Sequence, residues 1–166
     1  LDGGAQLYTS GSATINNGTI KRIDTPTSGS SDSFAIQVMS GSSLILGASS
    51  GKKVTLESTY GIYNVGGTLN VRYATITTEG WSIAVNDSAT KTGEVIIGLN
   101  ATTTITSRSG NCIGTAVGRQ PNVTIHKGTL TSKGTDWDAG VIYWASEGTL
   151  TINGGTLTAS SAEGSE

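Results

Sequence analysis

The sequence is poor in cysteine, proline and charged residues. Its 166 residues include one cysteine and two prolines, and 13% of them are charged, with a net charge of -2. The single cysteine, Cys112, excludes an intramolecular disulfide and a thiolate metal cluster. Scarce Glu, Lys and Arg disfavour long helices, and the lack of a basic stripe disfavours nucleic-acid binding. No apolar run is long enough to predict a membrane span.

Glycine, threonine and serine are abundant instead, and they punctuate a repeat. Five segments begin alike: FAIQV, YGIYN, WSIAV, NCIGT and AGVIY. Their aligned apolar residues lie 26, 21, 30 and 28 residues apart, at Ile36, Ile62, Ile83, Ile113 and Val141. A period of this size is typical of a solenoid, in which each repeat stacks on its neighbours.

Two further apolar slots follow the first in each repeat. The second slot holds a pair: Ala13/Ile15, Leu44/Leu46, Leu69/Val71, Val95/Ile97, Val123/Ile125 and Leu150/Ile152. The third slot holds one residue: Ile20, Leu56, Ile76, Ile105, Leu130 and Leu157. Apolar and polar residues alternate within each slot, as expected for a half-buried strand, and Gly, Asn or Ser separates the slots.

These slots predict an all-β fold, a right-handed parallel β-helix of about five to six coils with three short strands per coil. The insertions around residues 87–93 and 133–138 should fall at corners, where length varies without breaking strand pairing. An antiparallel sandwich or barrel has similar turn spacing and is the competing architecture. We expect residues 1–166 to form a single domain excised from a longer multidomain protein, because the chain opens LDGG and ends in a polar tail.

The phrases GTLTINGGTLTA and GIYNVGGTLNV resemble the right-handed β-helix repeats of bacterial extracellular proteins. Such repeats occur in surface adhesins and in noncatalytic carbohydrate-binding modules of plant-cell-wall-degrading enzymes. The resemblance covers roughly residues 13–160 and implies an extracellular setting and a polysaccharide partner. It transfers no functional residue, because no ligand-binding motif is matched.

Acidic residues are dispersed along the chain, which disfavours the facing carboxylates of a glycosidase. One close pair, Asp136 and Asp138, is a weak candidate for binding calcium, and a solvated turn explains it equally simply. His126 has no visible acid or nucleophile beside it, and Cys112 has no paired base. We therefore expect no enzyme activity and no cofactor.

Aromatic residues are the first candidate binding surface. Phe34, Tyr60 and Trp81 share one slot, and strand alternation predicts that they lie on the core side with the aligned isoleucines. Three large rings within eight residues, starting at Trp137, exceed what a narrow interior can hold, so at least one should be exposed. Exposed rings with polar neighbours suit a sugar. The proposed contacts are Trp81, Trp137, Tyr143 and Trp144, with Tyr63 as a further candidate and polar support from Asn86, Asp136 and Asp138.

Threonines form the second candidate surface, because they flank the third slot in four successive repeats. The pairs are Thr75/Thr77, Thr104/Thr106, Thr129/Thr131 and Thr156/Thr158. They should face outward in two ladders, which resemble the ice-binding faces of some antifreeze solenoids. Irregular coil length argues against a face that matches a lattice, and the β propensity of threonine is the simpler explanation. The open ends of the solenoid are a third candidate, since unpaired edges invite pairing.

The sequence thus favours a noncatalytic, extracellular carbohydrate-binding module for a plant cell-wall polysaccharide such as xylan or a similar β-linked glycan. The alternative is a structural or adhesive β-solenoid segment of a bacterial cell-surface protein. An ice-binding face ranks third, and a cryptic lyase or hydrolase ranks fourth. The expected partners are polysaccharide and flanking domains, such as a glycoside hydrolase, with no nucleic acid and no membrane span.

Overall fold

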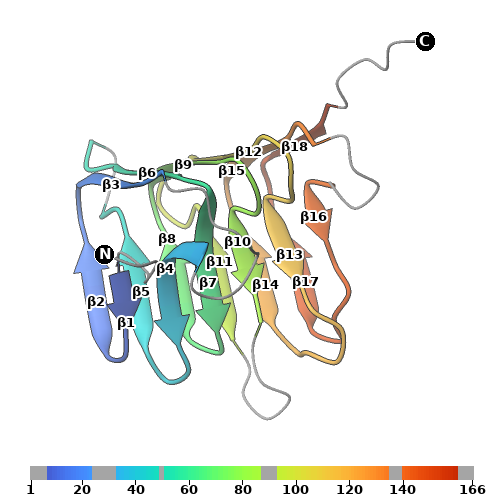
Figure 1. Cartoon of the computed structure of the whole chain (residues 1–166), viewed down its shortest axis with the longest axis horizontal. Helices are drawn as coiled ribbons and strands as arrows, with labels where there is room; N and C mark the ends of the chain where they lie inside the picture. The colour runs from blue at the N-terminus through green and yellow to red at the C-terminus, as the bar shows by residue number, and fades with distance from the viewer. Residues whose placement is uncertain (1–6, 24–32, 49–50, 87–92, 135–139, 161–166) are drawn as a thin grey trace.

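A computed structural model describes residues 7–23, 33–48, 51–86, 93–134 and 140–160 (Figure 1). Its strands form three parallel sheets of six strands each, here called sheets A, B and C, and the chain visits the sheets in turn. Sheet A contains β1 (Leu7–Thr9), β4 (Phe34–Met39), β7 (Tyr60–Val65), β10 (Ile83–Val85), β13 (Ile113–Thr115) and β16 (Ile142–Tyr143). Sheet B contains β2 (Ser12–Ile15), β5 (Ser43–Leu46), β8 (Thr68–Val71), β11 (Glu94–Ile97), β14 (Asn122–Ile125) and β17 (Thr149–Ile152). Sheet C contains β3 (Gly18–Arg22), β6 (Val54–Ser58), β9 (Ala74–Thr78), β12 (Thr103–Ser107), β15 (Gly128–Ser132) and β18 (Thr156–Ala159).

The molecule is therefore a β-solenoid of about five turns with three strands per turn, as the repeat predicts. Each strand pairs in parallel with its equivalents in the neighbouring coils, which excludes the antiparallel sandwich. Residues 87–92 and 135–139, on which the predicted corner insertions mostly fall, lie outside the described residues. The described residues contain no helix with the length and hydropathy needed to cross a membrane.

The core is a stack of aliphatic side chains, because strand alternation turns every second residue inward. In β12 the pattern is strict: Thr103, Ile105 and Ser107 are buried, and Thr104 and Thr106 are half-exposed. The predicted residues of the second and third slots pair in register throughout sheets B and C. Each coil buries the apolar side chains of its neighbours and so removes their surface from water.

One predicted position in the first slot is wrong by a residue. Ile142, and not Val141, continues the inward column of sheet A, because Ile113 pairs with Ile142. The carbonyl of Val141 accepts hydrogen bonds from the amides of both Cys112 and Ile113, so the pairing of the two strands shifts by one residue here. The hydrophobic pattern cannot reveal this shift, because Val141 and Ile142 are both aliphatic.

Corners between sheets B and C bring neighbouring coils into close backbone contact at glycine. Gly47 and Gly98 directly follow β5 and β11 and have φ angles of +77° and +69°. A Cβ atom on Gly98 would lie 1.6 Å from the carbonyl oxygen of Lys127. Glycine is needed here both for the left-handed backbone and for the space.

A column of buried hydroxyls lines the corner between sheets C and A. Ser107 Oγ donates to the carbonyl oxygen of Gly80 at 2.7 Å and accepts from the amide of Gly110 at 2.9 Å. Ser132 Oγ repeats the contact one coil later, donating to the carbonyl of Gly110 at 2.9 Å. These bonds satisfy polar groups in the interior and fix the path of the chain into sheet A.

The last coil lies open at one end of the stack. Ile152 and Leu157 occupy inward positions, yet 48% and 41% of their surface is exposed, because no further described coil covers them. Trp144 also belongs to this coil and packs against the hydrophobic core.

Candidate functional site

The outward residues of sheet A form one column with small residues at its centre. Register places Tyr8, Gln37, Tyr63, Ala84, Gly114 and Tyr143 side by side in successive strands. Ala84 and Gly114 leave a low floor between two tyrosines. Tyr63 and Tyr143 stand three strand spacings apart, roughly 14 Å at 4.8 Å per step.

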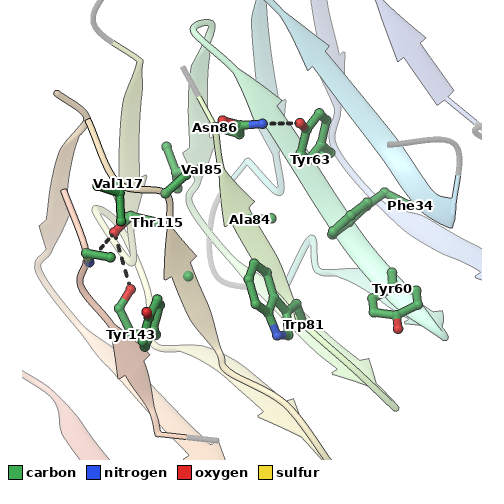
Figure 2. A pocket seen from close by; sticks show the side chains of 13 residues that line it. Phe34, Tyr60, Tyr63, Trp81, Ala84, Val85, Asn86, Thr115, Val117 and Tyr143 are labelled. Atoms are coloured by element: carbon green, nitrogen blue, oxygen red, sulfur yellow. Dashed lines mark hydrogen bonds between the residues drawn. The ribbon is translucent and has the colours of Figure 1, made fainter. Parts of the chain in front are cut away.

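A hollow of about 540 Å³ opens above this floor (Figure 2). Its volume lies within the range of small-ligand pockets. Its lining combines aromatic rings, small aliphatic residues and a few hydroxyl and amide groups: Phe34, Tyr60, Tyr63, Trp81, Ala84, Val85, Asn86, Gly114, Thr115, Ala116, Val117, Tyr143 and Ala145. None of these described lining residues carries a carboxylate, an amine, an imidazole or a thiol.

Trp81 lies on the outer face of sheet A, not on the core side as strand alternation predicts. A Cβ atom on Gly114 would lie 3.2 Å from Cε3 and Cζ3 of Trp81, so the six-membered part of the indole covers this glycine. Trp81 precedes β10, so the alternation of inward and outward side chains within that strand does not fix its direction. Its side chain leans toward the next coil, where Gly110 and Gly114 leave room for it.

Tyr60 lines the hollow on the outer face, so its predicted place on the core side is wrong, whereas Phe34 is buried, as predicted for a core residue, and also lines the hollow. The ring of Phe34 contacts that of outward-facing Tyr63, with centroids 5.1 Å apart, and that of Tyr60, with centroids 5.4 Å apart. Phe34 is 3% exposed, and Tyr60 and Tyr63 are half-buried. The three rings form one wall of the hollow.

Polar groups are concentrated at two places in the lining. Asn86 Nδ2 donates a hydrogen bond to the hydroxyl of Tyr63, while Asn86 Oδ1 has no hydrogen-bond partner (Figure 2). On the opposite side, Thr115 Oγ1 donates to the carbonyl oxygen of Tyr143 at 3.3 Å and accepts from the amide of Ala145 at 2.9 Å. Both sets of bonds hold ring-bearing strands in place around the floor.

The structure brings together four of the residues predicted from the sequence: Trp81, Tyr143, Tyr63 and Asn86. Trp144, which follows β16, is not among them, because it is partly buried and packs against the hydrophobic core. Trp137, Asp136 and Asp138 lie outside the described residues. Among the described residues, no three acidic, histidine or cysteine side chains gather to hold a metal ion.

Sequence reasoning missed the floor of the hollow. Ala84 and Gly114 carry no functional group, and the signal that marks them is a pair of small residues in an outward column otherwise occupied by large ones.

The side chains of Cys112 and His126 lie outside the hollow. Cys112 is fully buried, and burial raises the pKa of its thiol to about 11. His126 Nδ1 lies 3.4 Å from Asn153 Nδ2 beside β14.

Comparison with protein-family models, curated proteins and solved structures gives no significant match for this chain. Fold and site together define the class: a parallel β-solenoid with an aromatic-walled hollow on the outer face of one sheet.

Proposed function

We propose that this chain is a noncatalytic carbohydrate-binding module and that the hollow on sheet A is its binding site. The observation that carries the proposal is the half-buried indole of Trp81, which packs against Gly114 in the floor of the hollow. A sugar presents C–H groups that pack on such a ring, while hydroxyl and amide groups at the rim bind its hydroxyls. Tyr63 and Tyr143 supply hydroxyl groups, and Asn86, whose Oδ1 is buried, positions the hydroxyl of Tyr63.

An uncharged glycan suits this site better than an acidic one. The described lining offers no cation to pair with a carboxylate, and an unpaired charge is costly to remove from water. We therefore expect neutral β-linked polysaccharides of the plant cell wall, such as xylan or β-glucan, to bind more tightly than pectin. The expected setting is a bacterial extracellular protein with flanking domains, for example a glycoside hydrolase.

Affinity electrophoresis in gels containing xylan, β-glucan, pectin or a soluble cellulose tests the proposal. We expect retardation by at least one neutral glycan and its loss in Trp81→Ala. Removing a central aromatic contact costs at least about 2 kcal/mol in well-packed interfaces, or about 30-fold in the dissociation constant.

Tyr8→Ala is the matched control, because Tyr8 occupies the same outward column, is 58% exposed and lies outside the hollow. It should migrate like the unmodified chain. If no glycan retards the unmodified chain, the proposal fails, and the structural or adhesive solenoid segment becomes the better explanation. That alternative is favoured by the packing of Trp144 against the core, which leaves this expected ring only partly exposed.

A further inference from the structure

Threonine ladders on sheet C are longer than the sequence pattern indicates. The first rank runs through all six strands: Thr19, Thr55, Thr75, Thr104, Thr129 and Thr156. The second rank, two residues further along each strand, contains Lys21, Glu57, Thr77, Thr106, Thr131 and Thr158. All ten threonines are half-exposed or exposed, so their hydroxyls and methyls lie on the surface.

The ladders keep their register although the coils differ in length. β6, β9, β12 and β15 have five residues each and pair without a bulge. The strands of sheet C keep this register on both sides of the longest repeat, from β9 through β12 to β15. Irregular coil length is therefore no objection to a periodic face, contrary to the expectation from the sequence.

The two ranks, together called the threonine face, are uncharged over four strands, and the exposed Glu79–Arg108 ion pair lies beside Thr77 at one margin. Figure 1 shows sheet C edge-on as a thin layer along the top of the molecule. From β9 to β18 every outward position of the two ranks is threonine, and the only charges in the ranks are the paired Lys21 and Glu57, 3.1 Å apart at one end. The natural counterpart of these two ranks is an uncharged and periodic surface that can form hydrogen bonds.

The spacing of the threonines can be compared with the spacing of water molecules in ice. Threonines recur about every 4.8 Å between coils and about every 6.7 Å along a strand. Tetrahedral water with hydrogen bonds of about 2.75 Å has second-neighbour oxygens about 4.5 Å apart and a layer repeat of about 7.3 Å. Both repeats of the face fall within about a tenth of those of ice. We propose that the threonine face of sheet C binds the surface of ice crystals.

Threonine has the chemistry that such a contact needs. Its β-branched side chain is restricted at χ1, so neighbouring hydroxyls hold similar positions along a rank. The methyl groups gain by leaving liquid water, and the hydroxyls replace lost hydrogen bonds with bonds to lattice oxygens. A rigid ladder loses little conformational entropy on binding.

Thermal hysteresis and ice recrystallisation of the unmodified chain test the proposal directly. We expect a measurable gap between melting and freezing points, and smaller ice grains than with an unrelated protein at equal concentration. Thr104→Lys places an ammonium in the middle of the first rank, between Thr75 and Thr129. It should lower the hysteresis about tenfold or more, because a charge is costly to desolvate.

Thr124→Lys is the control, since Thr124 lies on the outer face of sheet B. It should keep the hysteresis of the unmodified chain, and circular dichroism should show the same fold for both lysine variants. Absence of hysteresis in the unmodified chain, or equal loss in both variants, would overturn the proposal. Trp81→Ala should leave hysteresis unchanged, so this inference and the glycan-binding proposal fail independently.

Discussion

Gly114→Val changes the floor of the hollow while leaving the strand intact. The backbone of Gly114 lies outside the left-handed region, and this glycine sits within β13. A valine suits a strand, and its effect on the free energy of unfolding should stay within about 1 kcal/mol. The functional effect should be far larger. The added Cβ would lie 3.2 Å from two ring atoms of Trp81, and the two methyls beyond it require the indole to move.

Displacement of Trp81 removes the surface on which a sugar packs. Loss of a central contact of at least about 2 kcal/mol corresponds to about 30-fold weaker binding. Isothermal titration calorimetry with an oligosaccharide of the retarding glycan measures the affinity, and urea unfolding measures stability. Thr124→Val on sheet B should change neither. Binding of Gly114→Val within about threefold of the unmodified chain would refute the indole platform as the site.

Three further perturbations test the fold. Ile83→Ala opens a cavity in a fully buried stack whose backbone is hydrogen-bonded on both sides, and urea unfolding should show a loss of about 3–4 kcal/mol. Gly98→Ala should be much more destabilising than Gly118→Ala, because both glycines have left-handed φ but only Gly98 faces a backbone oxygen at 1.6 Å; thermal melting compares them. The raised pKa of Cys112 means that the folded state retains its proton more tightly than the unfolded state. Stability should therefore fall as the pH rises from about 9 toward 11, and Cys112→Ala should remove this part of the pH dependence in urea titrations.

The fold could be predicted from the sequence because the same pattern of buried apolar residues recurs in every coil. The inward residues of sheet C alternate with polar ones, as do most of those in sheet B, where Ile45 and Ile96 are exceptions, and a parallel stack is the arrangement that aligns them all. The offset at Val141 was not accessible, because it arises from backbone hydrogen bonds from the amides of Cys112 and Ile113 to one carbonyl, and the side-chain pattern fits Val141 and Ile142 equally.

The site was accessible only in part. Trp81, Tyr63 and Tyr143 stand out as aromatic residues, but their common face depends on register and on which neighbours are small. Alternation failed for Trp81 because this residue lies at a corner, where the direction of a side chain depends on space in the next coil. Thr19 and Thr55 escaped notice because Lys21 and Glu57 interrupt the Thr-x-Thr pattern in their strands.

The one-dimensional stack lets its coils unfold separately. Trp144 packs against the core in the last described coil, whereas Trp81 lies beside β10 in the middle of the stack. Since each coil contacts only its neighbours, a coil at one end of the described stack can detach while the centre stays intact. In a Trp137→Phe background, which leaves these two indoles as the tryptophan fluorophores, their fluorescence changes need not coincide as denaturant is added.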